Sequence, residues 1–200
     1  MAAPSRYDVS ASEAGIEDGV LKNKLGIKDQ EDLEDLETLL LNDAQTHFFE
    51  MLSQGKVVFN LALVFSIHKY FLETLYAWAG KLRTVDISKD GMTFASAKFL
   101  PSSVEVFGKI LKANLPKATD SKKIIAEKIA IIHNEFNAVH PFREGNGRTI
   151  RLFLDLLVAS LGLHAVDWAV KSYMRACLKG MSQDNAPMAT IVYRGITKKL

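Results

Sequence analysis

Cysteine is almost missing from this chain of 200 residues, since Cys177 is the only one. A single cysteine cannot form an intrachain disulfide, and proteins that lack disulfides are typical of reducing compartments. The composition is otherwise that of a compact protein, with 48% hydrophobic residues. A chain of this length and composition is expected to form one domain with a sizeable apolar core.

Long apolar runs and a strong charge bias are lacking as well. The apolar stretches are interrupted before the roughly 18 residues that a membrane-spanning helix needs. The first residues, MAAPSRYDVSASEAG, have neither the basic start nor the apolar stretch of a signal peptide. The formal net charge is only +2, so neither nucleic acid nor an anionic membrane is expected as a partner. A cytoplasmic protein is the default expectation, although delivery into a host cell by another route would leave no trace in these features.

Apolar residues recur with helical spacing over most of the chain, which predicts a mainly helical fold. Helices are expected over residues 28–54, 60–78, 101–115, 121–139, 167–178 and 188–196, and from a start near Gly147. Asp120 is the expected N-cap of the central helix, and its buried stripe is predicted to hold Ile124, Ile125, Ile129, Ile132, Phe136 and Val139. The six acids between Asp29 and Glu37 are expected to line a solvated helix face.

Residues 83–96 differ from this helical pattern. RTVDI is a short β-branched run, SKDG is a turn in which Gly91 can take a positive φ, and MTFAS returns. Two strands alone bury little surface, but an exposed hairpin edge can receive an extended peptide by strand addition. The segment therefore predicts a β-hairpin flap, with a mere surface turn between helices as the alternative.

The run HPFREGNGRTIR, from His140 to Arg151, carries most of the chemistry. It gathers a titratable base, a carboxylate, two glycines around an amide and two guanidiniums, and the apolar run LFLDLLVASLGL follows directly. The polar cluster therefore opens a helix, whose N-terminus offers unpaired amides and a positive dipole end to an anion. These groups suit a nucleotide polyphosphate that is held on a metal beside an acceptor that loses a proton.

The glycines and arginines of this run favour a phosphate ligand. Gly145 and Gly147 let the backbone adopt conformations barred to other residues and let a ligand approach the amides closely. Asn146 can turn its amide toward the same pocket. Arg148 and Arg151 are three apart and project from the first helical turn, where two planar forks of donors suit phosphate oxygens.

The remaining residues suit a metal and a base. Glu144 would repel phosphate unless a divalent cation sat between them. His140 precedes Pro141, which is expected to restrict the histidine backbone to an extended form, and a neutral imidazole there could take the proton of an attacking hydroxyl. Phe142 is expected to be an apolar peg in the core. Each signal alone has a plainer interpretation: a core or capping histidine, a solvated arginine pair, a Gly-Asn-Gly turn. Their joint occurrence in this order favours the chemical interpretation.

The run resembles the signature of the Fic (filamentation induced by cAMP) family: His, any residue, Phe, any residue, Asp or Glu, Gly-Asn-Gly-Arg, two of any, Arg. The chain matches every fixed position, at His140, Phe142, Glu144, Gly145, Asn146, Gly147, Arg148 and Arg151. The resemblance extends to residues 19–29, 76–95 and 135–142, and so to nearly the whole chain. It implies an all-α Fic-type helical bundle with a small β-hairpin flap over the active site. One Fic domain would span 1–200, with a lead-in over 1–27, the flap over 84–96 and the signature loop and helix start over 140–151.

The resemblance also implies an activity, the transfer of AMP from ATP to a hydroxyl of a target protein that docks on the flap (AMPylation, or adenylylation). His140 would be the general base that activates this hydroxyl, and Glu144 would hold Mg²⁺. The loop from Arg143 to Gly147, which includes Gly145 and Asn146, would cradle the α- and β-phosphates. Arg148 would brace those phosphates and Arg151 would reach the γ-phosphate, while Thr93 and Phe94 of the flap would face the nucleotide.

Regulation is predicted from an incomplete motif. Many members of the family carry an inhibitory helix with Ser or Thr, three residues of any kind, Glu, then Gly or Asn; its Glu pairs with the second motif arginine. Here only Thr46 to Glu50 (THFFE) resembles it, and Met51 follows. The resemblance therefore implies a toxin-like enzyme that a separate small antitoxin restrains by supplying this Glu.

Two other functions remain as alternatives. The first is another transfer on the same scaffold, either phosphoryl transfer like that of Doc toxins, or other nucleotidyl or phosphocholine transfer. Doc-like motifs replace the Gly-Asn-Gly-Arg portion, which this chain retains. The second is a catalytically silent module that holds a peptide on the flap, which predicts decay in the motif where none is visible.

Overall fold

The computed structural model describes residues 8–9, 15–17 and 19–197. In this part of the chain the helices are α1 (Gln30–Ser53), α2 (Leu61–Leu72), α3 (Leu100–Asn114), α4 (Lys122–Val139), α5 (Asn146–Ser160), α6 (Tyr173–Met181) and α7 (Ala186–Thr197), with a 3₁₀ turn at Ala97–Phe99. The strands are short: β1 (Asp8–Val9), β2 (Ile16–Glu17), β3 (Val20–Leu21), β4 (Ile87–Lys89) and β5 (Met92–Thr93). The expected all-α fold with a small hairpin is confirmed. The rest of the predicted lead-in, residues 1–7, 10–14 and 18, lies outside the described residues.

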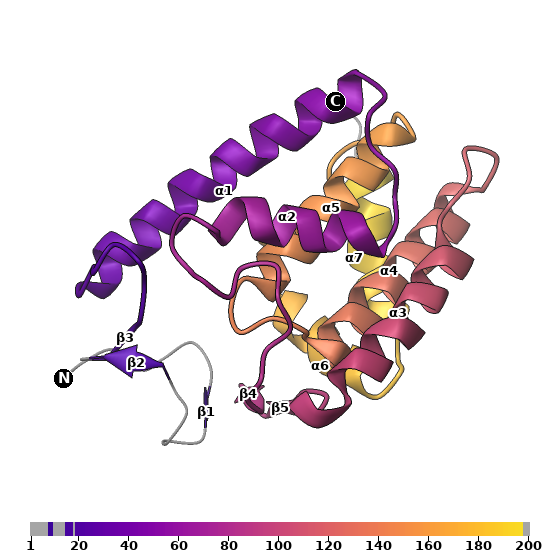
Figure 1. The fold of residues 1–200 in the computed structure, drawn as a ribbon. Coiled ribbons are helices and arrows are strands. Elements are labelled where there is room, and N and C mark those ends of the chain that lie inside the picture. The colour runs from indigo at the N-terminus through magenta and orange to yellow at the C-terminus, as the bar shows by residue number, and fades with distance from the viewer. Residues whose placement is uncertain (1–7, 10–14, 18, 198–200) are drawn as a thin grey trace.

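Helix α4 is the centre of the fold, and it packs against α3, α5, α6 and α7. It can do so because Ile125, Ile129, Ile132 and Phe136 recur every three or four residues and are almost fully buried. Ile124 was expected in the same stripe but is 42% exposed, since neighbouring helical residues point about 100° apart. On the other side of the molecule, α1 and α2 lie together and both contact α5 (Figure 1).

Side chains cap the helices where the sequence places short polar residues. Asp29 accepts hydrogen bonds from the amides of Glu31 and Asp32 and so begins α1. The N-cap of α4 is Ser121, whose hydroxyl accepts from the amide of Ile124. The prediction of Asp120 as the cap is therefore wrong by one position. Asp120 instead accepts from the amide of Lys117 and from Lys128 Nζ, at 2.9 and 2.7 Å.

Two helices are shorter than their apolar patterns suggest. Helix α2 ends at Leu72 and does not continue to Trp78, because the amides of Leu75 and Tyr76 both donate to the carbonyl of Leu72 and turn the chain. Helix α6 begins at Tyr173, and the residues from 167 to 172 precede it without helix. The turns after α2 bring the Tyr76 hydroxyl to 2.6 Å from Oε1 of Glu37 in α1 and lead on to the flap, so the early end of α2 helps to build the site.

The flap is a hairpin with a tight turn at Asp90 and Gly91, whose φ angles are 49° and 78°. Two positive φ values are typical of the type I′ turn that suits a hairpin, so the predicted role of Gly91 is confirmed. Strand β4 pairs antiparallel with β5, with Ser88 opposite Thr93. It begins at Ile87, later than the RTVDI run suggested. The other edge of β4 pairs with β1, which places Asp8 opposite Ser88.

No helix among the described residues combines the length and the apolar character that a membrane crossing requires.

Candidate active site

His140 ends helix α4 in a left-handed conformation, with φ 47° and ψ 62°. The expected extended backbone is therefore wrong: the amide of His140 donates to Phe136 at 2.8 Å and closes the last turn of α4. Left-handed residues other than glycine are uncommon and cluster at functional sites. The conformation turns the chain from α4 into the signature loop within one residue.

The imidazole of His140 has a defined tautomer. Its Nδ1 lies 3.1 Å from the carbonyl oxygen of Asn137. A carbonyl oxygen can only accept, so Nδ1 carries the proton, and Nε2 of the neutral ring has the lone pair. The Asn137 side chain contacts the sulfur atoms of Met92 and Met181.

Burial keeps this imidazole neutral. His140 is only 5% exposed, and its ring stacks on Phe94 of the flap with centroids 3.8 Å apart. Burial lowers the pKa of His140 to about 3, and the charges of Arg83 and Lys89 act in the same direction, while the hydrogen bond to Asn137 opposes them. At neutral pH the ring is therefore able to accept a proton.

Arg83 is a site residue that the sequence analysis missed. Its guanidinium is buried and donates to four carbonyl groups: from Nε to His140 at 2.8 Å, from Nη1 to Val85 at 2.7 Å, and from Nη2 to Ala95 and Val139. Arg83 belongs to no recognisable sequence motif, so its hydrogen bonds to these carbonyl groups are revealed only by the folded structure. Arg83 ties the two ends of the flap to the end of α4.

Gly145 begins helix α5 and has a φ of 78°. A Cβ at this position would lie 2.7 Å from Leu72 Cδ1 and 3.3 Å from Phe71 Cε1, so conformation and space both require glycine. The same conformational argument is wrong for Gly147, which lies inside α5. There a Cβ would lie 3.1 Å from Arg151 Nη1, which is the end of a flexible side chain and can shift, so the structure does not require glycine at this position.

Asn146 stabilises the signature loop from within. Its side chain is fully buried, accepts from the amide of Phe142 at 2.8 Å and donates to the Phe142 carbonyl at 2.7 Å. Both ends of the amide are thus bonded to the loop backbone, and the expectation that it turns toward a ligand is not met. Phe142 is the expected core peg, fully buried and stacked on His68 with centroids 3.7 Å apart.

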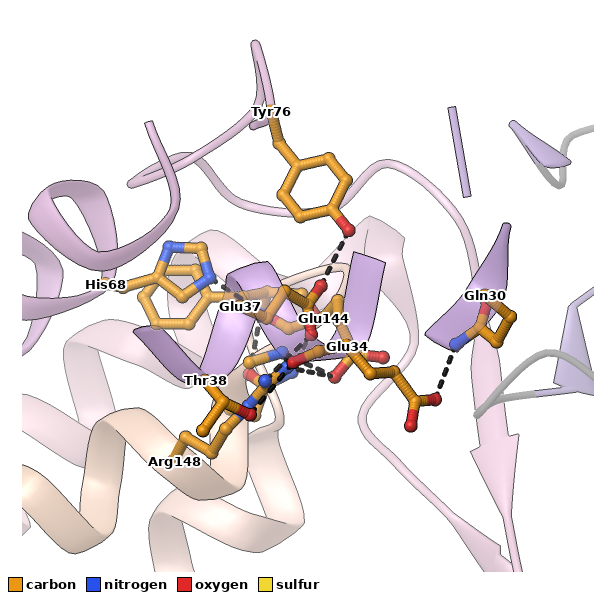
Figure 2. A network of polar contacts seen from close by, with 11 residues as sticks. Gln30, Glu34, Glu37, Thr38, His68, Tyr76, Glu144 and Arg148 are labelled. Atoms are coloured by element: carbon orange, nitrogen blue, oxygen red, sulfur yellow. Dashed lines mark hydrogen bonds and ion pairs between the residues drawn. The ribbon is translucent and has the colours of Figure 1, made fainter. Parts of the chain in front are cut away.

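Glu144 and Arg148 meet at the start of α5, next to a third charged residue. Oε1 of Glu144 accepts from the amide of Gly145 at 2.8 Å and lies 3.4 Å from Arg148 Nη2. The other arm of Arg148, Nη1, lies 2.7 Å from Oε2 of Glu37 in α1 (Figure 2). Arg148 therefore lies between two carboxylates, and no phosphate is needed to explain its position.

Glu37 contradicts the expectation of a solvated acidic face. It is 2% exposed and accepts from the hydroxyl of Tyr76 at 2.6 Å. The signal that could have revealed it is periodicity, because Leu33, Glu37, Ala44 and Phe48 are the buried residues of α1 and share one helical face. The other acids of this run follow the prediction only in part, since Asp35 is exposed and Glu34 is half-buried.

The second motif arginine points to a different helix. Arg151 Nη1 donates to the hydroxyl of Tyr173 in α6 at 3.2 Å, and the Tyr173 hydroxyl also lies 2.8 Å from Nε2 of the buried His133. Arg148 and Arg151 project from the same turn of α5, as expected. Arg148 contacts Glu37 in α1, whereas Arg151 contacts Tyr173 in α6. Tyr173 is a further residue that the sequence analysis missed.

The remaining predicted site residues lie near the flap and the loop. Arg143 is buried and lines a cavity of about 500 Å³, together with Lys22, Lys24, Trp78 and Lys81. Thr93 is exposed on β5, while Phe94 is buried against His140. Two of these cations already have partners, because Lys22 Nζ lies 2.9 Å from Glu17 Oε1 and Lys24 Nζ donates to the carbonyl of Glu73 at 2.6 Å.

A divalent cation at this site would need ligands from the substrate as well as from the protein. Among residues 8–9, 15–17 and 19–197, no group of three or more His, Cys, Asp or Glu side chains could bind a metal. Magnesium commonly takes one or two carboxylates together with the phosphate oxygens of a substrate. The carboxylate of Glu144, beside the N-terminus of α5, fits that kind of shared site.

Comparison with known proteins gives consistent matches. The Fic/DOC family model matches residues 58–158. The protein adenylyltransferase VbhT of Bartonella schoenbuchensis is 32% identical over 186 residues, which cover 91% of this chain and 38% of VbhT. The probable protein adenylyltransferase y4lH of Sinorhizobium fredii is 30% identical over 180 residues, 88% of this chain and 91% of y4lH. This chain therefore spans less than half of VbhT but most of y4lH.

Solved structures give the same fold. The chain is similar to the Bartonella effector protein BepC from Bartonella tribocorum, solved with bound AMPPNP, with a TM-score of 0.71 and 25% identity. The match covers 90% of this chain and 93% of that one. The Fic domain of Bep8 from another Bartonella shares the fold with a TM-score of 0.72 and 21% identity.

Proposed function

The chain belongs to the Fic/DOC family, and from that premise we propose that it transfers AMP from ATP to a hydroxyl side chain of a target protein. The observation that carries this proposal is the buried, neutral imidazole of His140, in which Nδ1 donates to the Asn137 carbonyl and Nε2 therefore has the lone pair of a base. The names of VbhT and y4lH as adenylyltransferases, and the AMPPNP bound to BepC, support the same reaction.

His140 acts as the general base in this scheme. Nε2 takes the proton of the target hydroxyl, the hydroxyl oxygen attacks the α-phosphorus of ATP, and pyrophosphate leaves. An imidazole with a pKa of about 3 is too weak a base to form a free alkoxide first. The proton therefore moves as the new oxygen–phosphorus bond forms, and a positioned base of this kind contributes about 10²–10⁴-fold in rate.

The polyphosphate is held by the start of α5 and by Arg151. The first amides of a helix have no acceptor within the helix, and they lie at the positive end of its dipole, so they attract phosphate oxygens. Glu144 would hold Mg²⁺, which supplies charge neutralisation for the phosphates when it is bound. Arg148 is engaged by Glu37 and Glu144, so we assign the γ-phosphate to Arg151 and the positioning of Glu144 to Arg148.

The target docks on the flap in this proposal. Extended peptides add to the exposed edge of a hairpin through backbone hydrogen bonds. The outer edge of β4 already pairs with β1, where Val9 lies opposite Ile87. Among the described strands, β5 (Met92–Thr93) is the edge of this sheet that pairs with no further strand, so we assign the target segment to that edge.

We also propose that a separate antitoxin chain restrains the enzyme. The segment that resembles the inhibitory motif, Thr46 to Glu50, lies inside α1, and the Thr46 hydroxyl donates to the Asn42 carbonyl within the same helix. It is thus part of a long helix that packs on α2 and α5. Native mass measurement of the protein from its source is the test: a mass that equals this chain alone would overturn the antitoxin.

Labelled ATP separates the proposed transfer from the alternatives. The protein is incubated with a lysate and either α-labelled or γ-labelled ATP. Protein-bound label from the α position alone means AMP transfer, whereas label from the γ position alone means phosphoryl transfer. Absence of label from both, with a peptide retained on the protein, would mean a silent binding module.

A further inference from the structure

Glu37 is a buried carboxylate that the proposed reaction does not use. It comes from α1 and lies outside residues 58–158, which carry the family match. A buried charge is costly unless it is paired and hydrogen-bonded. Glu37 meets both conditions, because Arg148 Nη1 lies 2.7 Å from Oε2 and the Tyr76 hydroxyl donates to Oε1 at 2.6 Å.

The partner of Glu37 is itself held from three sides. Arg148 contacts Glu37 through Nη1 and Glu144 through Nη2 (Figure 2), and its guanidinium carbon lies 4.9 Å from the ring centre of Phe71. The two ion-pair distances differ. The contact with the distant Glu37 is 2.7 Å, while the contact with Glu144, four residues away on the same helix, is 3.4 Å. Glu37 therefore draws the arginine away from its helical neighbour.

This asymmetry matters for the carboxylate of Glu144. A guanidinium fork can take both oxygens of one carboxylate when nothing else competes for it. If Arg148 lost Glu37, the same fork could close on Glu144, since residues four apart on a helix are neighbours. A carboxylate in a two-pronged ion pair is a poorer ligand for a cation. Glu37 also adds a negative charge, so the three side chains together carry a formal charge of −1.

The hydroxyl of Tyr76 keeps Glu37 in place. Burial and the charge of Glu37 raise the pKa of Tyr76, so this hydroxyl stays protonated and donates. The tyrosine comes from the turns after α2 and reaches α1 across 39 positions of the chain. The Tyr76 hydroxyl thus restrains Oε1 of Glu37, while Arg148 contacts Oε2.

We propose that Glu37 is a positioning residue for the reaction: by holding Arg148, it keeps the Glu144 carboxylate oriented toward a divalent cation. The inference rests on the proposed function, because it assigns Glu144 to the cation that accompanies the nucleotide. Groups that orient metal ligands typically change metal affinity by about 10–100-fold when they are removed. The effect should therefore appear in cation binding itself as well as in the rate.

The test compares Glu37→Gln with a matched control, Asp35→Asn. Both remove one acid from α1 with little change of shape, but Asp35 is exposed. Binding of Mn²⁺ is measured by electron paramagnetic resonance with AMPPNP present, and AMPPNP binding is measured again without metal. Glu37→Gln should weaken Mn²⁺ binding at least about tenfold and leave metal-free nucleotide binding almost unchanged, while Asp35→Asn should change neither.

The outcomes separate this inference from the proposed function. A Glu37→Gln protein that melts at a lower temperature but binds Mn²⁺ as tightly as the wild type would assign Glu37 to stability alone and overturn the inference. If the wild type transfers no AMP, the proposed function is overturned. If Glu37→Gln nevertheless weakens Mn²⁺ binding, the inference about Glu37 still stands. If Glu37→Gln does not fold, Tyr76→Phe removes one restraint on Glu37 and should shift Mn²⁺ binding in the same direction by a smaller factor; unchanged binding there would refute the inference.

Discussion

Arg83 donates from Nε to the carbonyl oxygen of His140 across 2.8 Å, from a guanidinium that has no exposed surface. The same guanidinium donates to Ala95, where the flap rejoins the bundle. The proposed base and the proposed target-docking hairpin therefore share one side chain. Movement of the flap would move the backbone of His140, which gives target docking a direct physical route to the base.

Replacement of Arg83 by lysine should weaken both stability and transfer. Lysine has three donors on one atom and cannot reach carbonyl groups that lie around a planar fork. Buried carbonyls that lose their donors cost about 1–3 kcal/mol each, so we expect the free energy of unfolding to fall by about 3 kcal/mol. Urea unfolding and the transfer rate of the folded fraction measure the two effects. The same change at the exposed Arg175 is the control, and equal behaviour of both variants would contradict the assigned role.

Replacement of His140 by asparagine should slow transfer strongly and spare nucleotide binding. Asparagine tolerates the left-handed conformation that His140 adopts, so the loop is preserved while the base is lost. We expect the rate of AMP transfer to fall by about 10²–10⁴-fold, with little change in AMPPNP affinity. Calorimetric titration checks the second part. Loss of AMPPNP binding would instead mean that His140 holds the nucleotide, and the base role would be withdrawn.

Stability should fall as the pH drops below about 6.5. Burial lowers the pKa of His68 and His133 to about 4 and that of His140 to about 3, from 6.5. Between these values the unfolded chain binds more protons than the folded one, so acid favours unfolding by on the order of 2 kcal/mol per histidine at pH 5. Burial raises the pKa of Asp155 to about 6, so acid stabilises the folded state through this group. The three histidines outweigh this single opposing contribution.

Urea midpoints at pH 7.5, 6 and 5 measure this slope. Replacement of the exposed His164 by glutamine is the control and should leave this slope unchanged, because the slope is assigned to the three buried histidines. A midpoint that stays constant from pH 7.5 to pH 5 would show that the buried histidines titrate normally.

Replacement of Thr149 by valine should stabilise the protein. Within the part of the chain that the structure describes, the Thr149 hydroxyl is fully buried and has no hydrogen-bond partner. An unsatisfied buried polar group costs about 1–3 kcal/mol, and an apolar group of the same shape avoids that cost. We expect a gain of about 1 kcal/mol by thermal unfolding. Thr149→Ser, which keeps the hydroxyl and loses the methyl group, should destabilise; a gain in that variant would contradict the explanation.

The chain order of the signature was enough to predict part of its local structure. Phe142 had to enter the core, and Gly145 had to take a positive φ at the start of a helix, because both properties depend on neighbours in sequence. The flap turn at Gly91 follows from the same kind of argument. The left-handed backbone of His140 could not be predicted in this way. The hydrogen bond from the His140 amide to Phe136 and the bond that Arg83 donates to the His140 carbonyl outweighed the extended conformation that Pro141 favours.

The partners of the motif were decided by the tertiary structure. Glu37 lies 111 positions before Arg148, and Tyr173 lies 22 positions after Arg151; neither belongs to a pattern that local spacing can reveal. By itself the sequence determined the residue types of the site, the helices that carry them and the family to which the chain belongs. Only folding decided which charges are buried together, because the free energy of a buried ion pair depends on distances across the core that no sequence interval encodes.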